Sequence, residues 1–206
     1  MRMCLNDAGK RFNRDWIFRH VDLEIHAGRR YALTGHNGSG KSTLLQLIGG
    51  MITPSEGSRS IENQGKALEE DTAYREISFC APYLELIEEM TGMESLRFHQ
   101  GFKPLRDEHT PASILEAVGL QKAADKQVRH YSSGMKQRLK LAQAFFADTA
   151  LLLLDEPCTN LDRTGIALYQ TLLATCTEGR IVVIASNDET EYEGADTILS
   201  MDAWKK

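Results

Sequence analysis

The sequence predicts an α/β fold: a core with a mixed, mostly parallel sheet, an N-terminal antiparallel β portion and a helical subdomain inserted into that core. Residues 151–154 and 181–185 are unbroken apolar runs, which are typical of parallel strands buried on both faces. In the stretch before them, apolar residues recur every three or four positions, which indicates helices. We therefore expect one domain with a core of residues 1–83 and 148–206 and a helical subdomain of about residues 84–147.

The N-terminal elements follow from local patterns. The first thirty residues are expected to form two short strands around a turn, because residues 21–25 alternate apolar and charged side chains. Residues 31–34 predict a short apolar strand that leads into a glycine-rich loop, and residues 42–48 predict a helix that ends at a glycine pair. Residues 54–58 are typical of a turn. Residues 77–81 predict a strand that stops before a proline.

The middle of the chain predicts three helices. Thr91 and Glu94 have the spacing of a capping box, which opens a helix over residues 91–98. Residues 111–118 have helical apolar spacing and precede a glycine. Residues 135–147 place apolar side chains on one face of a third helix.

The composition excludes several classes of protein. Of 206 residues, 42% are hydrophobic and 26% are charged, so the chain is not a disordered tail. The net charge of −5 disfavours a nucleic-acid partner, because such proteins usually carry a basic surface. No apolar run approaches the ~18–20 residues that cross a bilayer, so a membrane role requires a partner. The cysteine spacing and the absence of a secretory apolar stretch predict a cytoplasmic protein.

A phosphate-binding loop is the strongest motif. Residues 35–42 read Gly-His-Asn-Gly-Ser-Gly-Lys-Ser, which fits G-x-x-x-x-G-K-[ST] between a predicted strand and a predicted helix. The glycines let backbone N–H groups converge on an anion, and the helix N-terminus adds its positive end. Lys41 is expected to reach the β- and γ-phosphates, and the Ser42 hydroxyl to ligate Mg²⁺. The alternative, a glycine-rich structural turn, is disfavoured by this context.

Two acids follow the strand of four leucines. Asp155 and Glu156 come where ligands bind in open α/β sheets, at the carboxyl end of a buried strand. Asp155 is expected to hold Mg²⁺ directly or through water. Glu156 is placed to polarise a water molecule for attack on the γ-phosphate. The alternative is an acidic turn with no chemical role.

The segment at residues 131–138 separates the possible classes of P-loop NTPase. It reads Tyr-Ser-Ser-Gly-Met-Lys-Gln-Arg and opens a helix, which Ser132 or Ser133 can cap, while Gly134 allows close approach of an anion. In this order and spacing it resembles the signature motif, usually L-S-G-G-Q, of ATP-binding cassette (ABC) ATPases. The resemblance implies a head-to-tail pair of copies, in which Ser132 and Gly134 act on the ATP held by the other copy.

The resemblance extends along nearly the whole chain. Residues 157–162 resemble the family's D-loop, with Asp162 as its acid, and residues 10–13 resemble the aromatic A-loop. Phe12 is then expected to stack on adenine, with Trp16 as the alternative. The resemblance further implies that residues 82–101 dock on a membrane-spanning permease.

Several positions depart from the family pattern. Tyr83 stands where the family usually has the Q-loop glutamine; a phenol is a poor Mg²⁺ ligand, and its bulk is expected to keep it out of the site. Asn187 replaces a histidine that touches the γ-phosphate; its amide can donate to a phosphate oxygen but cannot titrate near neutral pH. In the signature, Tyr131, Ser133 and Met135 replace leucine, glycine and glutamine. We expect ATP binding with slowed hydrolysis.

These observations lead to one hypothesis with two alternatives. We expect an ATP-binding, ATP-hydrolysing subunit of an ABC transporter that dimerises on ATP and energises a separate permease at the cytoplasmic face of the membrane. The alternatives are a soluble ABC-type ATPase unlinked to transport and a slow or inactive regulatory subunit. The expected catalytic residues are Lys41, Glu156 and Asn187, and the expected Mg²⁺ ligands are Ser42 and Asp155. The residues expected to bind the nucleotide are Phe12, Gly35, His36, Asn37, Gly38, Ser39, Gly40, Lys41, Ser42, Thr43, Ser132, Ser133, Gly134 and Asp162.

Overall fold

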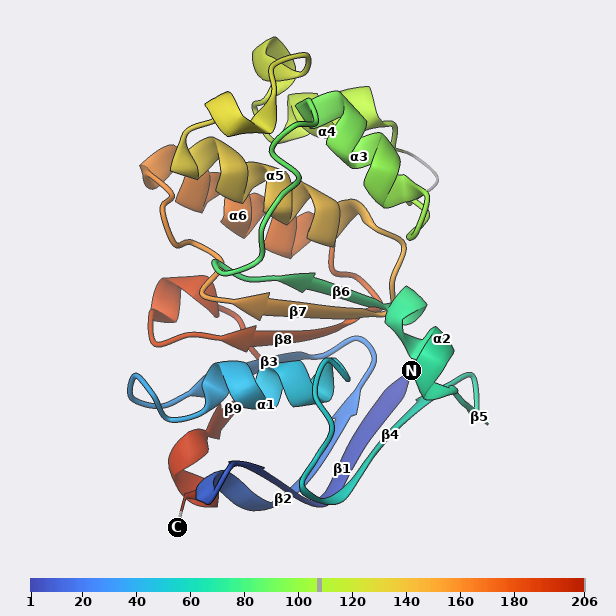
Figure 1. Ribbon diagram of the computed structural model, residues 1–206, viewed down its shortest axis with the longest axis vertical. Helices are drawn as coiled ribbons and strands as arrows, with labels where there is room; N and C mark the ends of the chain where they lie inside the picture. Colours follow the sequence, from blue (N-terminus) through green and yellow to red (C-terminus); the bar gives the residue numbers. More distant parts are fainter. Residues whose placement is uncertain (107–108, 206) are drawn as a thin grey trace.

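The computed structural model describes residues 1–106 and 109–205 and separates the strands into two sheets (Figure 1). The first sheet is antiparallel, with the order β2-β1-β4-β5 among the described residues. Its strands are β1 (Arg2–Phe12), β2 (Asp15–His26), β4 (Glu56–Asn63) and β5 (Lys66–Ala67). The expected antiparallel N-terminal portion is confirmed, although β1 and β2 are long strands rather than short ones.

The second sheet is parallel and has the order β6-β7-β8-β3-β9 among the described residues. Every residue of β7 and β8 is buried, as the unbroken apolar runs predict. The register pairs Asp155, at the end of β7, with Ala185, at the end of β8. The strands are β3 (Arg30–Thr34), β6 (Ile77–Cys80), β7 (Leu151–Asp155), β8 (Ile181–Ala185) and β9 (Thr197–Ser200).

Helices cover both faces of the parallel sheet (Figure 1). Helix α1 lies between the two sheets, α5 and α6 cover the opposite face, and α3 and α4 form a layer beyond α5. The longer helices are α1 (Lys41–Ile48), α3 (Gly92–Gln100), α4 (Pro111–Ala117), α5 (Ser133–Phe146) and α6 (Arg163–Thr175). The short ones are α2 (Glu70–Ala73) and the 3₁₀ turns Tyr74–Glu76, Gln121–Ala123, Val128–His130, Glu189–Glu191 and Met201–Trp204.

The leucines of β7 connect the two hydrophobic cores. Leu152 and Leu154 pack in the core that contains the apolar faces of α5 and α6. Leu151 and Leu153 point the other way, into the core beneath α1 and the antiparallel sheet. Alternate residues of a strand face opposite sides, and burying each leucine contributes about 1.5–3 kcal/mol. This central strand therefore holds its carboxyl end in a fixed position.

Helix boundaries follow the expected caps. Thr91 Oγ1 accepts a hydrogen bond from the Glu94 N–H at 3.2 Å, and the Glu94 carboxylate accepts one from the Thr91 N–H at 2.8 Å, so the predicted capping box is confirmed. Pro111 opens α4 as its first residue.

The prediction of a turn over residues 54–58 is wrong for residues 56–58. Glu56 already belongs to β4, because it pairs with Gly9 of β1, and Ser58 pairs with Asn6. Helix α6 was not predicted at all. The start of β4 depends on pairing with β1, far away in the sequence, which a local pattern does not reveal. Helix α6 does have local signals, an N-cap at Asp162 and buried side chains at helical spacing (Tyr169, Leu172), and sequence reasoning missed them.

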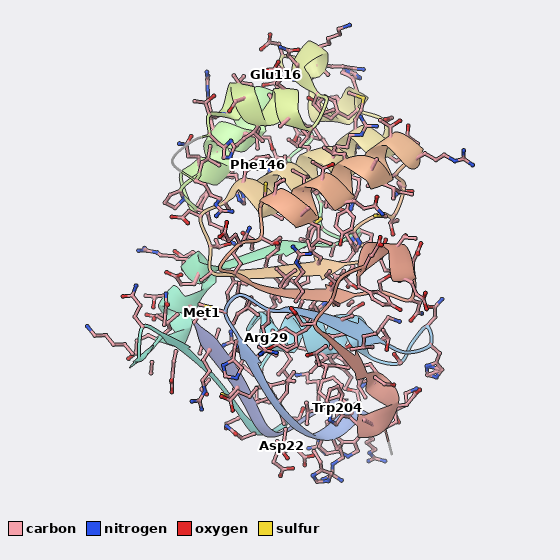
Figure 2. All side chains as sticks on the ribbon, turned by 180° about the vertical axis from the view of Figure 1, so that it is seen from behind. Met1, Asp22, Arg29, Glu116, Phe146 and Trp204 are labelled. Carbon is pink, nitrogen blue, oxygen red and sulfur yellow. The ribbon has the colours of Figure 1, made fainter. Side chains whose placement is uncertain are left out.

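A buried arginine holds the end of α5. The Arg180 side chain is 4% exposed, and its guanidinium donates to the carbonyls of Ala144 and Phe145 at 3.3 and 3.0 Å and to the Thr149 hydroxyl. Burial lowers the pKa of Arg180 to about 10, so the group remains charged at neutral pH. A cation at a helix C-terminus opposes the negative end of the helix dipole. Figure 2 labels Phe146, the last residue of this helix.

We predict that Arg180→Ala lowers the free energy of unfolding by about 3 kcal/mol, because it leaves two buried carbonyls without this donor. The melting temperature should fall by about 6–12 °C, measured by circular dichroism. Arg14→Ala, at an exposed position in the β1–β2 turn, is the control and should change stability by less than about 0.5 kcal/mol. Equal melting temperatures for the two variants would contradict the role given to Arg180.

Candidate functional site

The loop between β3 and α1 has a backbone conformation that strongly favours glycine. Gly38 and Gly40 have φ angles of +78° and +99°, in the left-handed region that L side chains rarely adopt. At Gly40, a Cβ atom would also lie 2.5 Å from Ile17 Cγ2. Gly40 directly precedes α1, so the free N–H groups of the first helical turn are open to an anion.

The charged and polar groups of this loop gather in its centre. Lys41 is 6% exposed, and its ammonium donates to the carbonyls of Gly35 and His36 at 2.6 and 3.4 Å. The Ser39 hydroxyl is buried and has no hydrogen-bond partner among the described residues. A cavity of about 240 Å³ opens over the loop, lined by Ile17, Asn37, Gly38, Ser39, Gly40, Lys41, Ser42, Thr43 and Glu156. Its donors suit a polyphosphate.

Asp155 lies at the carboxyl end of β7, beside the loop. Burial raises the pKa of this carboxyl group, and hydrogen bonds with Ser42 and Tyr83 act against that effect. The Ser42 hydroxyl and the Asp155 carboxylate are the oxygen donors that Mg²⁺ prefers. Among the described residues no group of three or more His, Cys, Asp or Glu side chains is placed to hold a metal ion. The donor set therefore fits an ion that takes its other ligands from phosphate oxygens and water.

Glu156 is held in a strained conformation at the same strand end. Its φ angle is +41°, which costs a non-glycine residue of order 1–3 kcal/mol. Its N–H donates to the Ala185 carbonyl at 2.9 Å, and its side chain lines the cavity over the phosphate loop. The strained turn thus brings a second carboxylate to the edge of this cavity.

Asn187 joins the end of β8 to the phosphate loop. Its carbonyl oxygen accepts from the Gly35 N–H at 3.3 Å, and its amide nitrogen donates to Asn37 Oδ1 at 3.2 Å. The side chain is exposed, so the amide lies at the surface of the loop. Another loop residue, His36, has its ring 2.7 Å from Lys205 Nζ.

The aromatic residues of the β1–β2 hairpin do not line this cavity. Phe12 is 49% exposed, with the Lys10 ammonium 5.3 Å from its ring centre. The Trp16 ring contacts two guanidinium groups, with Arg11 at 5.4 Å and Arg19 at 4.3 Å from the ring centre. The hairpin residue that lines the cavity is Ile17. Sequence reasoning missed it, because a search for an aromatic platform passes over an aliphatic side chain.

The expected signature segment forms a second surface. Ser132 caps α5 and accepts a hydrogen bond from the Met135 N–H at 3.2 Å. A Cβ at Gly134 would lie 3.1 Å from the Asn160 carbonyl, so this glycine allows the start of α5 to pack closely on the loop between β7 and α6. A cavity of about 310 Å³ is lined there by Ser132, Ser133, Gly134, Met135, Arg138, Asn160, Leu161 and Asp162. None of these residues lines the cavity over the phosphate loop.

The departures in the signature have structural roles. Tyr131 is buried, and its hydroxyl donates to the Ala123 carbonyl at 2.7 Å. Met135 packs against the core beneath α5 and α6. Both side chains therefore support the helical layer.

Two acids fix the loop after Glu156. Asp162 caps α6 by accepting from the Gly165 N–H at 2.7 Å, which lowers the pKa of this carboxyl group, and Arg138 lies 3.2 Å from the same oxygen. Glu191, which sequence reasoning missed, is buried and accepts from the Cys158 N–H at 2.8 Å. No local motif identifies Glu191, because its partner is 33 residues away.

The expectation that Tyr83 stays out of the site is wrong. Its hydroxyl lies 3.1 Å from Asp155 Oδ2. The ring is long enough to reach the end of β7 from the loop that follows the neighbouring strand β6. Beyond it, a cavity of about 610 Å³ lies between this loop and α5, lined by Pro82, Leu84, Glu85, Leu86, Ile87, Glu88, Glu89, Lys136 and Lys140.

The phosphate loop between β3 and α1, with a pair of carboxylates at the end of the buried strand β7, belongs to the P-loop class of nucleotide-binding folds. Residues 18–159 match the family described as ABC transporter, and the chain belongs to that family. It is an ATP-binding, ATP-hydrolysing subunit of the kind that energises transport. No helix within residues 1–106 and 109–205 has both the length and the apolar character needed to span a bilayer.

Known relatives agree with this assignment. The chain is 32% identical over 177 residues to the cytochrome c biogenesis ATP-binding export protein CcmA of Xanthomonas axonopodis pv. citri, covering 86% of this chain and 82% of that protein. It is 32% identical to the daunorubicin/doxorubicin resistance ATP-binding protein DrrA of Streptomyces peucetius, covering 88% of this chain and 57% of DrrA. An uncharacterized ABC transporter ATP-binding protein of Bacillus subtilis, YybJ, is 29% identical, covering 88% of this chain and 84% of that protein.

Solved structures share the fold. The dimeric, post-hydrolysis structure of the ATP-binding cassette MJ0796 bound to ADP and Pi superposes with a TM-score of 0.83 at 25% identity, covering 96% of this chain and 93% of that one. An ABC transporter ATP-binding protein from Pyrococcus furiosus gives a TM-score of 0.82 over the whole of both chains at 18% identity, which shows the fold alone.

We predict that Gly40→Ala weakens ATP binding by more than tenfold, because the new Cβ meets Ile17 and the residue must adopt a positive φ. Gly28→Ala is the matched control: Gly28 also has a positive φ, +75°, but a Cβ there has no heavy atom within 4 Å. Both variants carry the backbone strain, so both should melt lower than the wild type. Fluorescence titration with a labelled nucleotide separates them, and equal nucleotide affinities would contradict the prediction.

Proposed function

We propose that this protein is a Mg²⁺-dependent ATPase that works as a head-to-tail pair of copies and transmits ATP binding to a membrane permease. One observation carries the proposal. The phosphate loop with Glu156 and the signature surface line two cavities that share no residue. A second copy, turned head to tail, would bring its signature surface over the phosphate-loop cavity.

The residues of the first cavity have complementary roles in hydrolysis. Lys41 and the loop N–H groups would bind the β- and γ-phosphates, and Ser42 and Asp155 would hold Mg²⁺, which neutralises phosphate charge. The Glu156 carboxylate would accept a hydrogen bond from the attacking water and take up its proton. The Asn187 amide, next to Gly35, would donate to a phosphate oxygen without changing its own charge. The aliphatic side chain of Ile17 would contact the adenine ring of ATP.

The second copy would complete the site through its helix N-terminus. Ser132, Ser133 and Gly134 lie at the start of α5, where the helix dipole favours an anion. Asp162 already caps α6 and is paired with Arg138 in the same chain, which favours an indirect role in shaping this surface. The dimeric MJ0796 cassette, bound to ADP and Pi, supports such a pairing.

The 610 Å³ cavity between the loop after β6 and α5, which we call the docking cavity, supports the proposal that residues 82–101 dock a segment of the permease. Its rim combines the apolar Leu86 and the 43% exposed Ile87 with acidic side chains. Glu88 is paired with Lys136, whereas Lys140 donates to backbone carbonyls at the base of the loop. An apolar helix with a basic residue would complement this surface. The protein would then lie at the cytoplasmic face of the membrane, and the relative CcmA, named as an ATP-binding export protein, supports an association with a membrane transporter.

We predict that Glu156→Gln lowers phosphate release by at least about 100-fold while ATP still binds. ATP-bound dimers should then accumulate, as measured by light scattering after size exclusion. Glu116→Gln is the control, since Glu116 is an exposed carboxylate at the helical end of the molecule (Figure 2). Wild-type phosphate release no higher than that of Glu156→Gln would favour the alternative of an inactive binding subunit.

We predict that Ile87→Asp reduces recovery of the protein with native membranes several-fold, because a buried carboxylate in an apolar contact is costly. The control is Ile198→Asp on β9, since Ile198 is 61% exposed and lies outside the docking cavity. Recovery is measured by quantitative immunoblotting of membrane pellets. If the wild type itself stays in the supernatant, the soluble ABC-type ATPase becomes the better hypothesis.

A further inference from the structure

Three polar groups form a continuous hydrogen-bonded chain that ends at Asp155. Gln46 Nε2, on α1, lies 3.0 Å from the Tyr83 hydroxyl, and that hydroxyl lies 3.1 Å from Asp155 Oδ2. The three residues belong to the helix after the phosphate loop, the loop after β6 and the end of β7. The phenol therefore connects the docking loop to the carboxylate that is expected to hold Mg²⁺.

The direction of these hydrogen bonds is fixed by chemistry. An amide nitrogen only donates, so the phenol oxygen accepts from Gln46 and its single hydrogen is left for Asp155. A phenol keeps its hydrogen at neutral pH. The Asp155 carboxylate thus receives one hydrogen bond from Tyr83 in addition to the one from Ser42.

The base of the loop is anchored, so the phenol has a defined position. Lys140, on α5, donates to the carbonyls of Ala81 and Pro82 at 3.3 and 2.8 Å. The Tyr83 ring packs against Phe79 of β6, with ring centres 6.4 Å apart. The side chain is 48% exposed, with its hydroxyl directed toward Asp155. The rest of the loop lines the docking cavity.

We propose that Tyr83 is a positioning residue for the metal: its hydroxyl orients the Asp155 carboxylate and thereby sets the affinity of the site for a divalent cation. This inference rests on the Mg²⁺ dependence in the proposed function. Tyr83 acts through Asp155 and does not itself coordinate the ion. Groups that hydrogen-bond a metal ligand in this way typically change metal affinity by 10–100-fold when they are removed.

The test measures metal affinity directly. Mn²⁺, whose free form gives an electron paramagnetic resonance signal, is titrated into the complex of the full chain with ADP. Tyr83→Phe should raise the Mn²⁺ dissociation constant about tenfold, while the ADP dissociation constant in EDTA stays within about twofold of the wild type. Gln46→Met should give a smaller shift in the same direction, and the double variant should bind Mn²⁺ no more weakly than Tyr83→Phe.

Tyr74→Phe is the matched control, since Tyr74 is also 48% exposed and its hydroxyl is bound by Arg75 rather than by a site residue. It should leave the Mn²⁺ affinity unchanged. If the wild type binds Mn²⁺ but Tyr83→Phe binds it equally well or more tightly, this inference alone is overturned. If the wild-type complex binds no Mn²⁺, the metal dependence in the proposed function fails and the inference fails with it. Melting curves verify that each variant is folded.

Discussion

The site depends on the burial of a single strand. β7 lies inside the parallel sheet, between β6 and β8, and its leucines pack into both hydrophobic cores. Because both faces and both edges are occupied, the strand cannot shift without loss of packing on each side. Its carboxyl end is therefore rigid, and the strained conformation of Glu156 directly after it is maintained by the surrounding fold.

The loops that follow the strands on either side of β7 bring further side chains to the site. The loop after β6 brings Tyr83 to Asp155, and the loop after β8 brings Asn187 to Gly35 of the phosphate loop. Parallel strands place all their carboxyl ends at one edge of the sheet. Residues far apart in the chain thus meet within hydrogen-bond distance.

The helical layer has a different function. α5 presents its N-terminus in the signature surface, while its C-terminal carbonyls are held by the buried Arg180. The same helix supplies Lys140, which fastens the loop that carries Tyr83. One rigid helix therefore connects the signature surface, the docking cavity and, through that loop, the carboxylate at the end of β7.

The sequence by itself determined the elements whose signal is local. The phosphate loop, the leucine strand with its two acids, the capping box at Thr91 and the signature helix could all be predicted, because each depends on residue types at fixed short spacing. Tertiary structure alone decided the contacts between distant segments: Ile17 rather than Phe12 at the cavity, Glu191 on the loop after β7, and the hydroxyl of Tyr83 on Asp155. These depend on strand order and packing, which bring together side chains that no spacing in the chain relates.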